Sequence, residues 1–236
     1  MGEERLGGPL ETEVVENLNT PWLISLGRCA RRREAMIREC SKAGFPYHLV
    51  EAVDGEKEGD TDYLEKDLEA FAGLYRGRRA RPGEIACYAS HLMALERISG
   101  RDFPYGIVME DDVKILSDFE EAEETIARQV AEAPGFSVIY PGGPLLPKAH
   151  VIAKTGGTES LNRLSTALIG TQCYIISRRF SDFILENWGK FYRPIDEVYR
   201  FLSRDARFEF YHARKEDWWV SPDFNVASEI NKPKQP

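Results

Sequence analysis

The sequence predicts an α/β fold, a single domain in which helices flank a mostly parallel central sheet. Short apolar runs alternate with amphipathic helical patterns along the chain, and this alternation is typical of βαβ units. One run, Tyr105–Met109, is apolar throughout, as expected of a central strand that is covered on both faces. The chain has 236 residues, of which 42% are hydrophobic, enough to bury a full core without disulfides. We place the domain at residues 21–225, after a flexible polar leader at 1–20 and before a loose tail at 226–236.

The first part of the chain predicts a strand, a helix and a second strand. The apolar run at residues 22–26 reads as a buried strand, and residues 31–43 follow with apolar side chains on one helical face. Gly44 is a helix stop, and a strand at residues 45–50 completes the βαβ unit. Residues 55–81 are polar and charged, so we expect helix and loop at the surface there.

The middle of the chain repeats the alternation. Pro82 suits the first turn of a helix that runs to Gly100, and the apolar strand at residues 105–109 follows. Ser117 with Glu120 has the spacing of a capping box, which predicts a helix from there to residue 133.

The last part predicts two more strands and two more helices. Residues 136–140 and 173–176 are apolar runs, and Ser177 is a helix cap directly after the second of them. A short helix is expected near Pro194. Beyond Tyr211 we expect irregular chain.

Composition excludes several classes of protein. The net charge of −8 argues against a dedicated nucleic-acid binder, because phosphate binding needs a basic face. No stretch approaches the roughly 20 apolar residues of a membrane span, and the acidic start lacks the apolar core of a signal peptide, so we expect a cytoplasmic protein. The cysteines lack metal-ligand spacing and are interpreted as reduced core residues: Cys29, Cys40, Cys87 and Cys173.

Three consecutive acids, Glu110, Asp111 and Asp112, follow the apolar strand directly. Adjacent carboxylates repel one another unless a cation or polar ligand is present. Mg²⁺ or Mn²⁺ is the natural partner, and open α/β sheets bind ligands outside the carboxyl ends of their strands. The alternative interpretation is a solvated turn whose acids cap a helix.

Six short segments occur in a characteristic order between Trp22 and Pro222. They are Ile24-Ser25-Leu26 with Arg28 and Arg33, Ala52 to Gly55, Pro82 to His91, Val108 to Asp112, Gly170 with Tyr174 to Ser177, and Pro194 to Asp196. Together they resemble glycosyltransferase family 25, the family of lipooligosaccharide and procollagen galactosyltransferases. The chain departs from that pattern at Ser25, where the family usually has Asn, and at Ala86, where it usually has Gly.

The resemblance implies a GT-A fold and an inverting transfer. The donor would be a UDP-sugar, with galactose as the first choice of hexose, and the acceptor a hydroxyl of a saccharide, glycolipid or glycoprotein, as in lipopolysaccharide biosynthesis. Manganese, or magnesium, would stabilise the departing diphosphate. Asp112 is the first metal-ligand candidate, Glu110 the second, and His212 a third, expected just after a late strand.

Inversion in a single displacement also needs a carboxylate that takes the proton from the acceptor hydroxyl. Asp196 is the candidate for this general base, with Glu197 as its nearest rival. The plainer interpretation of Asp196 is an acid at the start of a helix after Pro194.

The donor site is expected to form around the ends of the first strands. Asp54 and Gly55 form a turn that suits the polar edge of a nucleotide, or else an ordinary Asp-Gly turn. Arg28 is preferred to Arg33 for the pyrophosphate because it follows the first strand at once. The donor-binding candidates are Ile24, Leu26, Arg28, Arg33, Asp54, Gly55, Glu84, Ser90, His91, Glu110 and Asp111.

Two further features have open interpretations. The cluster at residues 76–81 contains four arginines and would attract an anionic acceptor such as a phosphorylated glycolipid at a membrane surface, or it is a solvated loop. Trp218 and Trp219 would stack on a sugar, or they belong to the core or a lid.

Three other functions remain as alternatives. A non-catalytic relative would bind a carbohydrate or a partner with the same fold. A nucleotidyltransferase would share the acidic site, but the first strand is followed by Leu26-Gly27-Arg28 rather than by a glycine-rich loop with a lysine. A DNA or nucleobase glucosyltransferase is disfavoured by the net charge of −8. Donor hydrolysis with and without Mn²⁺ separates the enzymes from the binding protein.

Overall fold

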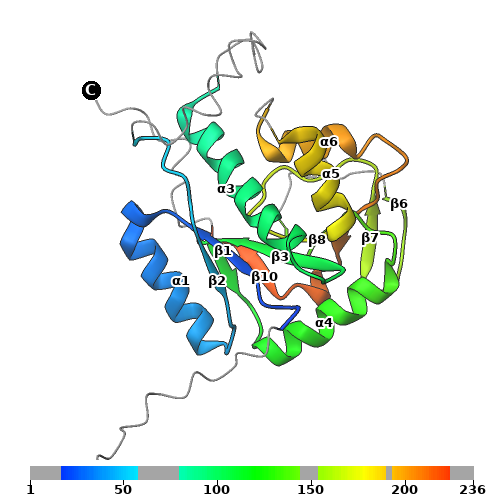
Figure 1. Ribbon diagram of the computed structural model, residues 1–236. Helices are drawn as coiled ribbons and strands as arrows, with labels where there is room; N and C mark the ends of the chain where they lie inside the picture. Colours follow the sequence, from blue (N-terminus) through cyan, green and yellow to red (C-terminus); the bar gives the residue numbers. More distant parts are fainter. Residues whose placement is uncertain (1–16, 58–79, 144–153, 190–192, 224–236) are drawn as a thin grey trace, which may run out of the picture.

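The computed structural model describes residues 17–57, 80–143, 154–189 and 193–223 of the chain. Within these ranges an eight-stranded sheet lies between two layers of helices (Figure 1). The expected tail, all but the ends of the polar segment 55–81 and most of the arginine cluster fall outside the described residues. No helix in the described part of the chain is both long and apolar enough to cross a bilayer.

The sheet is mixed, with most of its strands in one direction. Its order is β2 (His48–Glu51), β1 (Trp22–Ser25), β3 (Tyr105–Glu110), β8 (Cys173–Ser177), β5 (Val138–Tyr140), β9 (Phe210–Ala213), β7 (Leu161–Leu164) and β6 (Lys154–Gly157). The register makes β8 and β7 antiparallel to both of their neighbours. The other described strands of this sheet point the same way, which confirms the predicted α/β class with a mostly parallel sheet.

Helices cover both faces of the sheet. On one face lie α3 (Pro82–Ser99), α5 (Arg178–Trp188) and α6 (Ile195–Leu202), and on the other lie α1 (Ala30–Lys42) and α4 (Phe119–Glu132) (Figure 1). Strand β1 shows the alternation that this arrangement requires, since Leu23 packs with α1 while Ile24 packs with α3. Two hydrophobic cores therefore form, one on each face.

Local signals set several helix ends as predicted. Gly44 ends α1 with a φ of 72°, a left-handed conformation that glycine adopts without strain. Pro82 is the first residue of α3, and Glu84 Oε2 accepts a hydrogen bond from the Arg81 amide at 2.7 Å. Ser177 caps α5, where its hydroxyl accepts from the amide of Phe180. These ends were readable because each depends on residues within one turn of the helix.

The predicted cap of α4 was wrong by one residue. Asp118, not Ser117, is the N-cap, and its Oδ1 accepts a hydrogen bond from the Glu121 amide at 3.0 Å. Asp and Ser cap helices about equally well, and the negative charge of Asp118 adds a favourable interaction with the positive end of the helix dipole.

The expectation of irregular chain beyond Tyr211 was also wrong. Strand β9 continues to Ala213, a 3-10 turn, η4, follows at Lys215–Asp217, and β10 (Val220–Pro222) pairs antiparallel with β4 (Val113–Ile115). Trp219, before β10, is buried and stacks on Phe45, so it belongs to the core. Val220 pairs with Ile115, 105 positions earlier in the sequence, and no local pattern predicts such a pairing.

The folded body begins earlier than expected. Asn19, assigned to the leader from the sequence, is buried and accepts a hydrogen bond from the Tyr105 hydroxyl at 2.7 Å. Asn17 donates to Glu123 on α4 at 2.7 Å. These hydrogen bonds attach residues 17–20 to the first residue of β3 and to α4, so the domain includes them.

Candidate functional site

The site lies at the carboxyl ends of three neighbouring strands. Strand β1 pairs in parallel with both β2 and β3, with Ser25 opposite Glu51 and Ile24 opposite Glu110. The loop after β1, the turn after β2 and the acid triplet after β3 therefore meet at one edge of the sheet. This confirms the expectation that the βαβ pattern makes these strands neighbours.

Asp111 is the most tightly held member of the triplet. Its Oδ2 accepts a hydrogen bond from the Ser25 hydroxyl at 2.5 Å, and Nη2 of Arg32 lies 2.6 Å from its Oδ1. The Asp111 side chain is 1% exposed and that of Arg32 18%. Burial alone would lower the pKa of Arg32, but the charge and hydrogen bond of Asp111 raise it above its ordinary value. Asp111 is thus a neutralised anchor between β1, α1 and β3.

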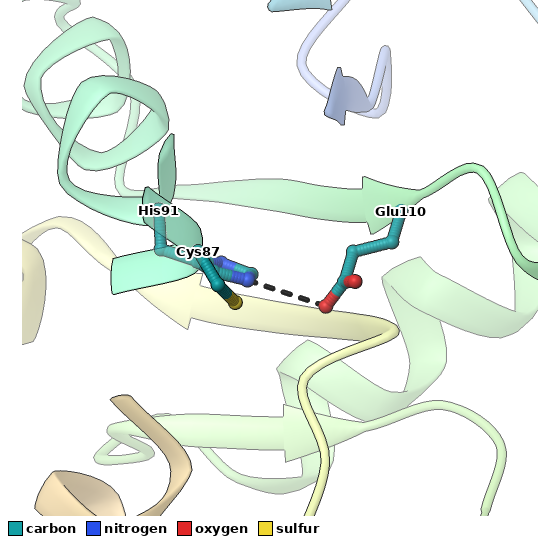
Figure 2. A group of neighbouring side chains, drawn as sticks. All are labelled: Cys87, His91 and Glu110. Atoms are coloured by element: carbon teal, nitrogen blue, oxygen red, sulfur yellow. Dashed lines mark hydrogen bonds and ion pairs between the residues drawn. The ribbon is translucent and has the colours of Figure 1, made fainter. Parts of the chain in front are cut away.

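Glu110 points into the fold toward α3 (Figure 2). Its Oε1 lies 3.2 Å from Nε2 of His91 and accepts a hydrogen bond from the Thr171 hydroxyl at 3.0 Å. Burial would raise the pKa of Glu110, but the bonds from His91 and Thr171 hold it below the usual value. Oε1 of Glu110 is therefore already engaged by protein groups, His91 and Thr171.

Asp112, in contrast to Glu110, has a carboxylate oxygen that no protein group in the described residues engages. Its Oδ1 is buried and has no hydrogen-bond partner among the described residues. Burial, together with the charges of Glu110 and Asp111, raises the pKa of Asp112 to about 7. A buried carboxylate oxygen without a partner, next to two further acids, has the surroundings that a hard divalent cation would relieve. The residues present therefore fit a metal ion held through Asp112.

Two arginine side chains, Arg28 and Arg33, contact the residues at the ends of β1 and β2. Arg28, in η1 (Gly27–Cys29), donates from Nε to Asp54 at 3.0 Å and lies 3.2 Å from Glu56 through Nη1. Arg33 donates to the backbone oxygen of Ser25 at 2.7 Å and pairs with Glu51 at 2.8 Å. Arg28 is thus placed on the Asp54 turn, whereas Arg33 closes the join between β1 and β2.

The turn after β2 is packed closely against α3. A Cβ on Gly55 would meet the backbone of Pro82 at 2.6 Å, so no larger residue fits without movement. Ser90 accepts a hydrogen bond from the Val53 amide at 2.9 Å and donates to Ala86. Other donor-site candidates have structural contacts: Glu84 caps α3, and Ile24 is buried in the core. Leu26 is the residue directly before η1.

A groove of about 870 Å³ opens between α1 and β4 beside the triplet. Asp111, Arg28 and Arg32 contribute charged groups to its lining, and Met36 and Ile115 contribute apolar surface. A mixed lining of this size accommodates a nucleotide or a short saccharide.

Asp196 and Glu197 begin α6 as predicted. Asp196 accepts hydrogen bonds from the amides of Glu197 at 2.8 Å and Gly170 at 3.2 Å. Burial raises the pKa of Asp196, and the hydrogen bonds from the Gly170 and Glu197 amides partly offset this. Glu197 instead pairs with Arg200 one turn along α6, at 3.3 Å.

His212 does not follow its strand as expected but lies within β9, opposite Tyr140 on β5 and Asn162 on β7. Its ring packs against Trp218 at 5.6 Å, and a Cβ on Gly143 would meet its Nε2 at 2.6 Å. Two strands, β8 and β5, stand between β3 and β9 in the sheet. His212 therefore occupies the same edge as the triplet but a separate part of it.

Sequence reasoning missed three participants. Arg32 was not chosen among the arginines of its helix, and Thr171 had no signal of its own. Cys87 was interpreted as a core residue without ligand spacing, yet its sulfur and the ligand atoms of His91 and Glu110 all lie within 4.8 Å of one another (Figure 2). Cys87 and His91 are four residues apart on α3, and that spacing was the available clue.

The fold and this edge define an α/β protein of the class that binds ligands beyond the carboxyl ends of its strands. The model of "Glycosyltransferase family 25 (LPS biosynthesis protein)" matches residues 19–140, more than half of the chain. The chain belongs to glycosyltransferase family 25, as its six segments predicted. The matched part contains the triplet, Arg28, Asp54 and His91, whereas Asp196 and His212 follow it.

Two curated relatives show how much is shared. The chain is 31% identical over 125 residues to procollagen galactosyltransferase 1-A of Xenopus laevis, covering 51% of this chain and 20% of that protein. It is 30% identical over 125 residues to "Probable inactive glycosyltransferase 25 family member 3" of Bos taurus, with coverage of 51% and 21%. The chain thus spans about a fifth of the length of these relatives.

Among solved structures, the chain is similar to one described as "Crystal Structure of A197 from STIV". The TM-score is 0.40 at 15% identity, covering 91% of this chain and 98% of that one.

Proposed function

We propose that this chain transfers a hexose, galactose first, from a UDP-sugar to a hydroxyl of a saccharide or glycoconjugate, with inversion and with the help of Mn²⁺ or Mg²⁺. Membership of glycosyltransferase family 25 supports a transferase. The observation that carries the finer proposal is the state of Asp112, whose buried Oδ1 has no hydrogen-bond partner among the described residues. Oδ1 of Asp111 also accepts no hydrogen bond, but it is ion-paired with Arg32. Glu110 is held by His91, so among the described residues Oδ1 of Asp112 is the oxygen left for a cation.

The proposed donor site runs from Asp112 to the Asp54 turn. Asp112 would hold the metal ion, and Glu110 and Asp111 would add negative charge behind it; a bound divalent ion stabilises charge that develops on the leaving diphosphate. Arg28 would orient the nucleotide from the other side, next to Asp54. Arg28 and Asp112 follow the neighbouring strands β1 and β3, so their positions would be fixed before the donor binds.

The proposed general base is Asp196. Burial disfavours its charged form and so raises its proton affinity, a property that suits a group that must accept a proton from a hydroxyl. Its backbone hydrogen bonds to Gly170 and Glu197 fix the carboxyl group in orientation. Glu197 is the weaker candidate, because it is paired with Arg200.

The test is donor turnover with and without added Mn²⁺. We expect UDP release from UDP-galactose that EDTA abolishes, and a loss of about a thousandfold in Asp112→Asn. Asp102→Asn is the matched control, because Asp102 is an exposed acid, paired with Arg178, that precedes the start of β3 at the end opposite the triplet. Wild-type, EDTA-insensitive turnover in Asp112→Asn would refute the assignment.

A second candidate function is binding without turnover. A specific observation favours it, namely that a relative at 30% identity is named probably inactive. A binding protein would be stabilised against heat by UDP with Mn²⁺, yet would release no UDP from any UDP-sugar. Measuring both properties on one preparation separates the two functions.

A crystal soaked with UDP and Mn²⁺ tests the position of the proposed donor site. UDP bound away from Arg28, Asp54 and Asp112 would reject the site.

A further inference from the structure

The strongest unassigned feature is the cluster of Cys87, His91 and Glu110 between α3 and β3. The thiol and imidazole lie on one face of the helix, and the carboxylate reaches them from the end of the strand (Figure 2). Their ligand atoms all lie within 4.8 Å of one another. His91 is buried, and Cys87 and Glu110 are half-buried, so the cluster is enclosed by the fold but not sealed.

We propose that Cys87, His91 and Glu110 bind a thiophilic divalent cation, with Zn²⁺ as the best match. One sulfur, one imidazole nitrogen and one carboxylate oxygen are all common zinc ligands, whereas a thiolate is a poor ligand for Mg²⁺. The distance from His91 Nε2 to Glu110 Oε1 is 3.2 Å. Two such ligands on a tetrahedral zinc ion lie about 3.3 Å apart, given bonds of about 2.0–2.1 Å.

The surroundings favour a cation and orient the ligands. Burial raises the pKa of the Cys87 thiol, and the negative charges of Glu110, Asp196 and Asp112 raise it further, so a thiolate here needs a cation beside it, which the same acids attract. The Tyr174 hydroxyl lies 2.9 Å from Nδ1 of His91, and the Thr171 hydroxyl donates to Glu110. Outer partners of this kind fix the ring and the carboxylate of zinc ligands.

The proton changes balance. Nε2 of His91 lies 3.2 Å from Glu110 and Nδ1 lies 2.9 Å from the Tyr174 hydroxyl. Because an ionised Glu110 can only accept, a neutral His91 without a cation would carry its hydrogen on Nε2 and accept from Tyr174 at Nδ1. On binding, the imidazole proton moves to Nδ1, which then donates to Tyr174, and Nε2 offers its lone pair to the cation. The Cys87 thiol releases its proton to water and becomes the thiolate ligand. The site has three protein ligands and leaves one position for water.

This site shares Glu110 with the proposed donor site but has different metal ligands otherwise, and its test does not depend on the transferase proposal. The hard cation would be held by Asp112, whose metal-facing oxygen is not part of the cluster. The two failures are distinguishable, because the Asp112 site depends on no sulfur and the cluster does.

The experiment uses Co²⁺ as a spectroscopic probe on the full chain. A cobalt–thiolate bond gives a charge-transfer absorption in the near ultraviolet, and tetrahedral cobalt gives intense visible bands. We expect both to saturate at one Co²⁺ per chain and to disappear when Zn²⁺ is added. Cys87→Ser should abolish the charge-transfer band, whereas Cys29→Ser, the matched control at the other half-buried cysteine, and Asp112→Asn should keep it.

Absence of the band in the wild type, or its persistence in Cys87→Ser, would overturn the proposal. His91→Gln is the second variant and retains the thiol, so it should weaken Co²⁺ binding by about 10–100-fold while the apo protein still unfolds cooperatively. Zn²⁺ should also raise the melting temperature of the wild type and not that of Cys87→Ser. A Zn²⁺ stabilisation that survives in Cys87→Ser would place the ion elsewhere and refute the site.

Discussion

Nη2 of Arg32 lies 2.6 Å from Oδ1 of Asp111. Because of this ion pair, the three acids at the end of β3 have different surroundings and different roles. Asp111 is neutralised by the arginine and fixed by Ser25. Glu110 turns inward to His91. Asp112 is left with a buried oxygen that has no protein partner among the described residues. Three identical-looking charges in the sequence are thus not interchangeable.

Removing Arg32 should destabilise the fold. Arg32→Met leaves the charge of Asp111 buried without its partner, and breaking a buried pair in this way costs about 3–5 kcal/mol; because Arg32 is partly exposed, we expect about 2–4 kcal/mol. Urea unfolding followed by circular dichroism measures the change. Arg31→Met, at the exposed neighbour, should stay within about 0.5 kcal/mol. Equal effects from the two variants would show that the ion pair contributes nothing.

The acids of the triplet should respond differently to neutralisation. In EDTA, Asp111→Asn should lose about 2–4 kcal/mol of unfolding free energy, since it leaves Arg32 without a carboxylate. Asp112→Asn should instead stay within about 1 kcal/mol of the wild type or exceed it, because burial and the neighbouring charges already disfavour its ionised form. Parallel urea titrations compare them. Comparable losses from both would contradict the roles assigned here.

Asp196→Asn tests the general base. The amide cannot accept the proton, so transfer should slow by roughly 10²–10⁴-fold, while the affinity for the UDP-sugar changes little. Initial rates and donor titration by calorimetry separate the two effects. Glu197→Gln is the control on the same turn of α6. If Asp196→Asn weakens donor binding and rate together, Asp196 belongs to the donor site instead.

Glu132 should make stability depend on acid pH. Burial alone would raise its pKa, but hydrogen bonds from Thr158 and Ser160 hold it below the ordinary value. A carboxylate with a lowered folded pKa stabilises the protein above its unfolded pKa, and this contribution disappears as the pH falls through the folded pKa. Glu132→Gln should therefore cost about 1–2 kcal/mol at about pH 7 and less at about pH 3. A loss that is the same at both values would refute this origin.

Much of the fold could be predicted because it depends on nearby residues. The strands at β1, β3 and β8 are apolar runs, and Gly44, Pro82 and Ser177 punctuate the helices within a single turn. The location of the acids at the edge followed from the same reasoning, because the apolar part of β3 ends at Met109 and the strand itself ends at Glu110, the first of them.

The remainder depends on contacts between distant segments. Arg32 reaches Asp111 across 79 positions of sequence, and Thr171 reaches Glu110 across 61, so no window of the sequence contains either pair. The antiparallel place of β8 and the pairing of β10 with β4 are equally remote. Residue type suggested a metal site at Asp112, but only the spatial arrangement distinguishes it from its two neighbours.

The insertion of β8 between β3 and β5 has a consequence for how the chain folds. During synthesis β1, β2 and β3 are all complete by residue 110 and have one another as partners. Strand β5 follows, but both of its neighbours in the sheet, β8 and β9, come later, so it stays unpaired until residues 173–177 are made. The step that joins the two halves of the sheet therefore closes a long loop and is slow compared with the first three strands. A fragment that ends at Tyr140 would expose the edges of β3 and β5 to other chains, and so would aggregate where the complete domain does not.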